Sequence, residues 1–375
     1  MSPSHWFSKN YNEASSRFRE QISNLKILGH NVVHEQLNLD HCGPFSEELI
    51  IDIAIVGSIQ SEKMFLYTSG IHGVEGFAGS AIQLSVLDLI SNEAPFDTHC
   101  IIFIHIINPY GMAWLRRVNE NNVDLNRNFL NEKSEFLGEP DGYERINNFL
   151  NPSNTPNKYD FSFYLKGALY LAKYGFRNLK QWIAQGQYQR SDSIQFGGKE
   201  MQKGPALLMN WLKNNITQVK EAVAVDLHTG LGPSGYDTIL IPDTINKEDY
   251  DVLKNIYQDH VAPLDPDKGI GYKIKGDLHS GITNFFTDIK WIYVTQEFGT
   301  FPPTTVFKNL RAENMWTQNS SLKGDEDLLK HWSRMKLMRT FNPDDQIWQS
   351  KIIDRGLKVF NDTRAYLIKS LSCFV

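Results

Sequence analysis

Cysteine is scarce in this sequence, and the few residues present form no motif. The chain of 375 residues contains only Cys42, Cys100 and Cys373, which stand far apart and include no CxxC pair. A disulfide framework needs an even number of cysteines at close spacing. We therefore expect reduced thiols and a cytoplasmic protein, with Cys100 in the core because it lies in an apolar run.

Long apolar runs and an excess of charge of one sign are missing as well. No stretch of about 18 consecutive apolar residues predicts a membrane span, and "MSPSHWFSKNYNEASSRFREQ" at the N-terminus lacks the apolar segment of a secretion signal. The net charge is -5 and the pI is about 6.1. These values do not favour nucleic acid or an anionic membrane as a partner.

The sequence also lacks a Pro/Ser/Gly-rich linker, a block of like charge and an internal repeat. Nothing therefore divides the chain, and we expect a single domain over residues 1–375. The stretch at about 130–205 is rich in Asn, Gln, Tyr and Gly. We interpret it as an insertion that lies near or over the functional site.

What the sequence does contain is an alternation of strand-like and helical patterns. Strands are expected in "NVVHEQL", "LIIDIAIVG", "KMFLYTS", "HCIIFIHII", "EAVAVDLHTG" and "WIYVTQEFG". Helices are expected near 12–25, within "FAGSAIQLSVLDLIS", at 325–337 and at 346–371. This pattern predicts the α/β class, with a mixed, largely parallel twisted sheet flanked by helices.

Three of the expected strands end in residues that can perform chemistry. His72 and Glu75 follow "KMFLYTS", His228 ends "EAVAVDLH", and Glu297 ends "WIYVTQE". In open α/β sheets, ligands bind beyond the carboxyl ends of the strands. We therefore expect these four side chains to meet at one edge of the sheet.

His72 and Glu75 lie in a glycine-rich turn, "YTSGIHGVEGFAG". A catalytic zinc takes three protein ligands and leaves one position open, and His nitrogen with carboxylate oxygen suits it. A chance His-x-x-Glu pair and a His228 that only caps the sheet edge are the alternatives. Asp226 has two interpretations, a ligand of a second metal ion or a strand-end carboxylate bonded to the backbone.

The segment "NPYGMAWLRRVNENNVDLNRNF", residues 108–129, carries three arginines and few acidic partners. Such arginines can be solvated charges. Beside a metal, the favoured interpretation is that they bind a carboxylate or stabilise an oxyanion. Glu297 at the end of a buried strand is costly unless it has a partner or a function.

At these residues the sequence resembles the M14 zinc carboxypeptidases, and most closely their DUF2817-type branch of metallopeptidases, which is related to succinylglutamate desuccinylase and aspartoacylase. The matching pieces are "SGIHGVEGFAGSAIQ", "INPYGMAWLRRVNENNVDLNRNF", "DLHTGLGP", "TQEFGTFP", "GQY" with "FGG", and "LRAENMW". They run in order from about Trp6 to about Trp316. The resemblance implies a single zinc carboxypeptidase-like (phosphorylase/hydrolase-like) domain.

The resemblance also implies roles for the residues at the strand ends. His72, Glu75 and His228 would hold one zinc ion per chain. Glu297 would be the general base that takes a proton from the zinc-activated water. Arg117 would stabilise the oxyanion, with its neighbour Arg116 as an alternative.

Three further residues receive implied roles in substrate binding and support. Asn126 and Arg127 would bind the terminal carboxylate of the substrate. Asp124 would accept a hydrogen bond from a ligand histidine, with His72 favoured. The tyrosine of typical family peptidases stays open between Tyr272 and Tyr188, His105 is interpreted as a core residue, and His279 as a loop residue that could approach the site.

The implied activity is a zinc-dependent hydrolysis of a C-terminal peptide or amide bond, on a peptide or a small acylated amino acid. An aspartoacylase-like deacylation of N-acyl amino acids is the alternative, since the same residues would serve it. A metal-binding protein without activity would lack the base or a ligand, and all four residues are present. A nucleotide site is less favoured, because "GIHGVEGFAG" is neither G-x-G-x-x-G nor a P-loop.

Overall fold

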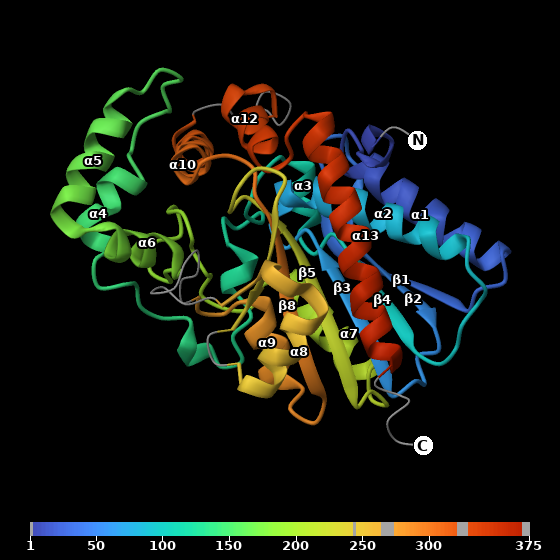
Figure 1. Ribbon diagram of the computed structural model, residues 1–375. Coiled ribbons are helices and arrows are strands. Elements are labelled where there is room, and N and C mark those ends of the chain that lie inside the picture. Colours follow the sequence, from blue (N-terminus) through green and yellow to red (C-terminus); the bar gives the residue numbers. More distant parts are fainter. Residues whose placement is uncertain (1–2, 243–244, 264–273, 321–328, 370–375) are drawn as a thin grey trace.

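A mixed sheet of eight strands runs through the centre of the protein (Figure 1). The structure is a computed structural model that describes residues 3–242, 245–263, 274–320 and 329–369. The strands are β1 (Val32–Cys42), β2 (Glu48–Gly57), β3 (Lys63–Ser69), β4 (Cys100–His105), β5 (Glu221–Thr229), β6 (Asp237–Ile241), β7 (Val261–Pro263) and β8 (Lys290–Phe298). Their order in the sheet is β1-β2-β4-β3-β5-β8-β6-β7.

The direction of the strands confirms the predicted fold class. The inner pairs β4-β3, β3-β5 and β5-β8 are parallel, as is β6-β7. The pairs β1-β2, β2-β4 and β8-β6 are antiparallel. The six strands expected from the sequence are all present. β6 and β7 were not expected, since strands of five and three residues are too short to give a clear pattern.

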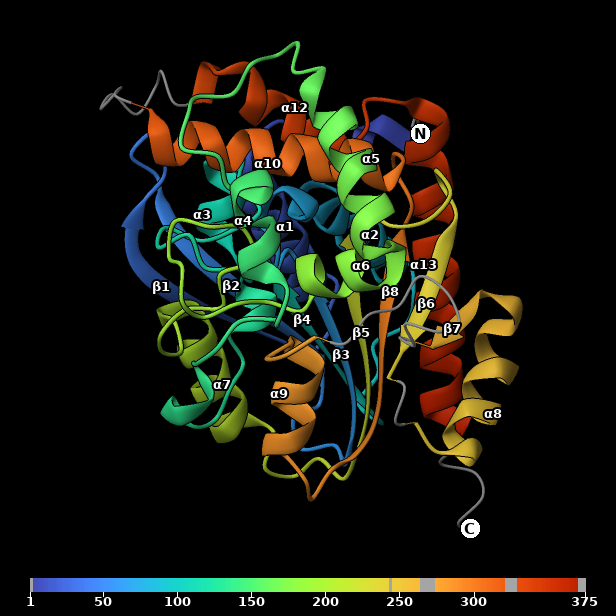
Figure 2. The same cartoon turned by 90° about the vertical axis from the view of Figure 1, so that its left-hand side faces the viewer.

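Helices cover both faces of the sheet, and alternate residues of the strands pack against them. In β4, Ile101 and Phe103 face one core, while Ile102 and Ile104 face the other. The first core is completed by α1 (Tyr11–Ile27), α2 (Gly76–Ser91), α8 (Lys247–Tyr257) and α13 (Gln346–Lys369), and the second by α7 (Lys203–Asn215) and α9 (Leu278–Phe285). Figure 1 shows α1, α2 and α13 on the near face, and Figure 2 shows α7 and α9 on the other. Burial on both faces explains why the inner strands are apolar throughout.

Each helix expected from the sequence has a described counterpart, and the structure adds helices that were not expected, among them α7 to α10. They are α1 (Tyr11–Ile27), α2 (Gly76–Ser91), α3 (Pro109–Ala113), α4 (Tyr143–Leu150), α5 (Ser162–Tyr174), α6 (Phe176–Ala184), α7 (Lys203–Asn215), α8 (Lys247–Tyr257), α9 (Leu278–Phe285), α10 (Pro303–Asn319), α12 (Trp332–Phe341) and α13 (Gln346–Lys369). The first part of the helix expected at 325–337 lies outside the described residues. The described helix α12 ends at Phe341, four residues after the expected end. The expected end at 371 also lies outside them.

Helix α2 is more apolar than the sequence patterns suggested. The range Gly73–Ser91 is long and apolar enough to cross a membrane, although we expected no such stretch. In this structure 89% of its most apolar 18-residue stretch is buried. The helix packs against β3, α1 and α13, which is the position of a core helix.

Helices α4, α5 and α6 lie in the stretch expected as an insertion. They stand at the left of Figure 1, and Figure 2 shows them in front of the sheet. Their own apolar cluster includes Tyr143, Phe149 and Phe163, and Phe307 of α10 packs against it. We keep the division into one domain with an insertion at about 130–205 as a proposal.

The free cysteines occupy two environments. Cys100 is buried in β4, as expected, and burial raises the pKa of its thiol to about 12. Cys42 is exposed at the end of β1. Cys373 lies outside the described residues.

Candidate metal centre

A tight glycine turn after β3 positions the first two candidate ligands. Gly70 has a φ of +68°, which an L side chain rarely adopts. A Cβ at Gly73 would overlap the backbone of Gly111, so the turn packs directly on α3. The backbone N–H of Gly73 also donates to the carbonyl of Arg117 at 3.0 Å. The glycines are therefore required by this close approach, which brings His72 and Glu75 to the carboxyl edge of the sheet.

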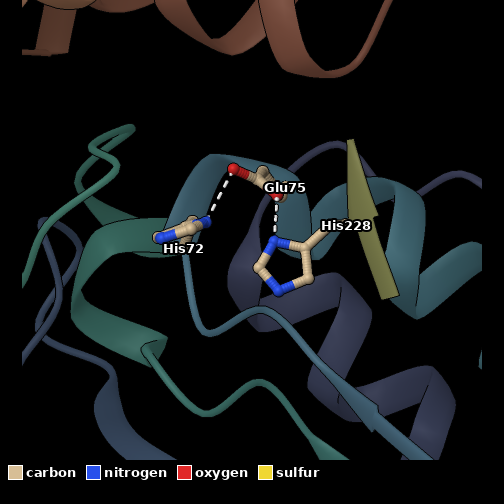
Figure 3. A group of neighbouring side chains, drawn as sticks. All are labelled: His72, Glu75 and His228. Atoms are coloured by element: carbon tan, nitrogen blue, oxygen red, sulfur yellow. Dashed lines mark ion pairs between the residues drawn. The ribbon is translucent and has the colours of Figure 1, made fainter. Parts of the chain in front are cut away.

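His72, Glu75 and His228 converge at this edge (Figure 3). His72 Nδ1 lies 2.8 Å from Glu75 Oε1, and His228 Nδ1 lies 3.1 Å from Glu75 Oε2. One ligand atom from each residue lies within 4.8 Å of the others. The three side chains are nearly fully buried, with exposures of 2%, 2% and 5%. They come from the turn after β3 and from the end of β5, so the fold joins segments about 150 residues apart.

Two aspartates hold the histidine rings from behind. His72 Nε2 lies 3.0 Å from Asp124 Oδ1, and His228 Nε2 lies 2.7 Å from Asp226 Oδ2. A carboxylate that accepts the Nε2 proton leaves Nδ1 with its lone pair, and in both rings Nδ1 points toward Glu75. This arrangement is typical of histidines that ligate a metal ion.

The sequence interpretation missed the role of Asp226. Its other oxygen accepts a hydrogen bond from the Thr68 hydroxyl at 2.7 Å, so both oxygens are used. The signal was present as Asp-x-His at the end of one strand. Residues two apart on a strand point to the same face, so Asp226 and His228 could have been paired from the sequence.

The chemistry of His72 supports a cation at this position. Its Nδ1 is buried and lies close to Glu75 Oε1, yet it makes no hydrogen bond. A buried nitrogen without a hydrogen bond is costly unless another partner supplies the contact. A metal ion between the three side chains would supply it, so the residues fit a divalent ion such as zinc.

The charges at the centre are set by contacts between its side chains, which outweigh the effect of burial. Burial alone would raise the pKa of Glu75, but His72 and His228 outweigh it and lower that pKa far below its usual range. Burial alone would lower the pKa of His228, but Asp226 and Glu75 raise it well above the ordinary value. Glu75 therefore stays ionised and offers a negative oxygen to a cation.

Glu297 lies beside this group on the neighbouring strand β8, where it pairs in register with His228. Its Oε1 accepts a hydrogen bond from the backbone N–H of Leu231 at 2.9 Å. Burial raises the pKa of Glu297 to about 7, and the nearby Glu75 adds to this effect. A carboxyl group with a pKa near neutrality can both accept and return a proton at working pH.

The two neighbouring arginines of "LRRVN" point to different places. Arg117 Nη1 donates to Glu75 Oε1 at 2.8 Å, and its Nε donates to Asp124 Oδ2 at 3.3 Å. Arg116 instead donates to Glu313 at 3.0 Å and to Asn122 at 2.7 Å. The structure therefore brings Arg117 to the candidate metal ligands, and it does not bring Arg116 there.

Asn126 and Arg127 are both buried, and the Asn126 amide oxygen and the Arg127 guanidinium have partners within the protein. Asn126 Oδ1 accepts from the backbone N–H of Leu278 at 2.9 Å. Arg127 is 0% exposed. Its Nε and Nη2 donate to the carbonyl of Ala184 at 3.1 and 2.6 Å, and its Nη1 donates to that of Asn126. In this structure the Arg127 guanidinium thus ties the end of α6 to the edge of the site.

The remaining candidates from the sequence have structural contacts. The Tyr188 hydroxyl donates to the carbonyls of Arg127 and Lys275, and Tyr272 lies outside the described residues. His105 is fully buried, stacks on Phe18 and contacts the Ser80 hydroxyl, in agreement with a core position. His279 was expected in a loop, but it is the second residue of α9 and packs on Tyr293.

Comparisons with solved structures find distant likenesses. Bovine thrombin-activatable fibrinolysis inhibitor, in complex with tick carboxypeptidase inhibitor, is 11% identical with a TM-score of 0.47, over 97% of this chain and 98% of that chain. Carboxypeptidase A of Helicoverpa armigera is 10% identical with a TM-score of 0.43, over 89% and 74%. A succinylglutamate desuccinylase of a Silicibacter species is 13% identical with a TM-score of 0.38, over 80% and 67%. Likenesses of this size assign no activity.

Comparison with curated proteins finds no match. The family model described as "Protein of unknown function (DUF2817)" matches residues 7–355. This range includes His72, Glu75, His228 and Glu297, and it covers most of the sequence. The chain therefore belongs to the DUF2817 family.

Proposed function

We propose that this protein is a zinc-dependent hydrolase that cleaves a C-terminal peptide or amide bond. One zinc ion would be held by His72, Glu75 and His228. When bound, the ion polarises a carbonyl oxygen and lowers the pKa of water toward neutrality. The observation that carries the proposal is the convergence of the three side chains, with each histidine held through Nε2 so that Nδ1 faces the same place.

Glu297 is the proposed general base. Its position next to His228 and its pKa of about 7 suit a group that removes a proton from the attacking water. The same carboxyl group, once protonated, can donate that proton to the leaving nitrogen. The hydrogen bond from the Leu231 N–H holds one oxygen, which orients the carboxylate for this exchange.

Arg117 is the proposed stabiliser of the oxyanion. Its guanidinium lies against Glu75 and Asp124, so a fixed positive charge borders the reaction centre. A preorganised charge of this kind favours a transition state in which the carbonyl oxygen becomes negative. Asp124 has a positioning role, because it contacts both His72 and Arg117.

Asn126 and Arg127 remain our proposed partners for a substrate carboxylate. Their hydrogen bonds to Leu278 and Ala184 restrict this role. To bind a carboxylate, Arg127 would have to exchange the Ala184 carbonyl for the substrate, which requires movement of the end of α6. An N-acyl amino acid deacylase is the alternative activity, and it would use the same metal, base and Arg117.

Two measurements test the proposal. Zinc content is measured after dialysis, and hydrolysis is followed on peptides with a free or amidated C-terminus and on N-acyl amino acids. We expect one zinc per chain and turnover that Glu297→Gln abolishes while zinc is retained. Cleavage confined to free-C-terminal peptides identifies a carboxypeptidase, and cleavage confined to N-acyl amino acids identifies a deacylase. Zinc-loaded protein that cleaves neither set contradicts the proposed function.

A further inference from the structure

The hollow next to Arg117 is lined in part by Gln195, whose amide oxygen has no hydrogen bond among the described residues. The hollow is lined by Arg117, Val118, Ile194, Gln195, Leu310 and Asn314, among others. Arg117 also contacts the candidate metal ligand Glu75, so the hollow adjoins the metal centre. Gln195 comes from the proposed insertion, and Leu310 and Asn314 come from α10. Part of the proposed site is therefore built by the insertion.

Gln195 is held in an unusual conformation. Its φ is 58°, which lies in the left-handed backbone region that residues other than glycine rarely adopt. Its carbonyl accepts from Gln187 N–H at 3.0 Å, the N–H of Ile194 donates to Asn151 at 2.9 Å, and the carbonyl of Phe196 accepts from Asp124 N–H at 2.8 Å. Contacts on both sides thus impose the strained backbone. Such strain is concentrated at functional sites.

The Gln195 amide has no partner for its oxygen. The residue is 9% exposed, and Oε1 is buried without a hydrogen bond among the described residues. An unpaired buried amide oxygen costs free energy, which a ligand donor would recover. The carboxamide also carries two N–H donors, so it can pair with a group that has both a donor and an acceptor.

The other polar groups around the hollow are already used. Asn122 accepts from Arg116 and donates to the carbonyls of Ser191 and Ser193. Glu313 is paired with Arg116 and with Arg334, at 3.0 and 3.1 Å. The Asn314 amide donates to the Asp192 carbonyl at 3.0 Å. The hollow therefore offers a neutral amide and not an unpaired carboxylate to a ligand.

We propose that Gln195 forms a subsite for a neutral peptide group of the substrate, adjacent to the amide bond that is cleaved. The hollow has a volume of about 10 Å³, room for one water molecule, so its walls would have to move apart before Oε1 could accept the N–H of that peptide group. This inference rests on the proposed function and narrows its substrate class. Substrates with at least two amide groups are favoured over simple N-acyl amino acids.

The test measures binding and turnover separately. Zinc-loaded Glu297→Gln protein is titrated calorimetrically with N-acetyl-trialanine. It is then titrated with derivatives of this peptide that each carry a methyl group on a different internal amide nitrogen. We expect methylation of one nitrogen to weaken binding on the order of tenfold, the size of effect expected when a buried acceptor loses its donor. In the double variant that also carries Gln195→Gly, the methylated and unmethylated peptides should bind equally, because the Gln195 oxygen that accepts the N–H is gone.

Three controls separate recognition from folding. Gln195→Gly accommodates a φ of 58° without strain, and an unchanged zinc content and melting temperature show that it folds. Gln195→Glu keeps an acceptor and should keep the preference for the unmethylated peptide. Gln189→Gly, at an exposed position of the same segment, should leave both affinities unchanged.

The outcomes separate the two proposals. A preference for the N–H peptide that Gln195→Gly abolishes supports the subsite, even if the wild-type protein shows no turnover and the proposed function fails. Equal affinities for all the peptides in the presence of Gln195 overturn the subsite. An absence of binding to any of them also overturns it, and turnover by the wild-type protein then decides the hydrolase proposal separately.

Discussion

His228 and Glu297 are paired in register on the adjacent parallel strands β5 and β8. In a parallel pair, residues in register point to the same face of the sheet. A candidate metal ligand and a candidate base from distant parts of the sequence thus lie side by side. Their proximity depends on the register of two strands, so it does not require a flexible loop to close.

The first prediction concerns the metal ligands. His228→Ala removes a nitrogen that faces Glu75, and we expect the zinc content to fall from about one ion per chain to near zero. Elemental analysis after dialysis measures this. His41→Ala is the matched control, because its half-exposed ring lies away from the centre. Retention of tight zinc binding by the His228 variant would refute the proposed ligand set.

The second prediction concerns the aspartates behind the histidines. Asp226→Asn keeps the size of the side chain but removes the charge that holds His228 Nε2. We expect zinc affinity to fall about 10–100-fold, as is typical when such a supporting carboxylate is lost. Competition with a chelating dye measures the affinity. If Asp226→Asn and Asp124→Asn both bind zinc like the wild type, the histidines are not positioned in this way.

The third prediction concerns Glu297 in the metal-free protein. Its pKa is raised from the model-peptide value of 4.5 to about 7, so the fold favours the neutral form. Ionisation of Glu297 in the folded protein therefore lowers the free energy of unfolding. This loss is absent below about pH 4.5, grows as the pH rises toward 7, and is complete above about pH 7. Glu297→Gln removes this loss, so the variant should be more stable at pH 8 by on the order of 3 kcal/mol.

Urea unfolding of the metal-free proteins at pH 4.5 and pH 8 measures this difference. We expect the gain in the free energy of unfolding from Glu297→Gln to shrink toward zero at the lower pH. A gain that is equal at both pH values would show that the pKa of Glu297 is not raised. Zinc must be absent, because a bound cation would favour the ionised form.

The fourth prediction concerns the contact between α6 and Arg127. Gly186 has a φ of +102°, and a Cβ there would lie 2.8 Å from Arg127 Cδ. Gly186→Ala therefore adds overlap to backbone strain, and we expect it to destabilise the protein by about 2–4 kcal/mol. Gly29→Ala is the matched control, since its φ is +88° but nothing lies within 4 Å of the added Cβ.

Thermal or urea unfolding compares these two variants. The control should lose only about 1–2 kcal/mol, the cost of the backbone strain alone. An equal loss of stability in both variants would mean that the Arg127 side chain moves away from the added Cβ at little cost. In that case the guanidinium could leave Ala184 without difficulty, and its proposed role in carboxylate binding would become easier to fulfil.

Much of the fold could be predicted from local patterns. The six longer strands and the helices α1 and α2 have a clear apolar periodicity, because each packs against the core over several residues. The short edge strands β6 and β7 have too few residues for such a pattern. The convergence at the sheet edge was also accessible, because the strand ends already placed His72, Glu75, His228 and Glu297 there.

The difference between Arg116 and Arg117 was not accessible. The two are neighbours in one loop with the same side chain, yet one contacts Glu75 and the other Glu313, 197 residues away. The burial of Arg127 depends likewise on the carbonyl of Ala184, 57 residues later. Direction and occupancy of such side chains depend on which distant backbone they meet.

By itself, the sequence determined the α/β class, the glycine turn and the residue types available at the strand ends, because these depend on local periodicity and backbone freedom. Only the tertiary structure decided that Asp226 supports His228, that Arg117 faces the candidate metal centre and that Gln195 Oε1 has no hydrogen bond among the described residues. These relationships arise from strand register and from contacts between distant segments. Neither strand register nor such a contact produces a repeating pattern of residues in the sequence.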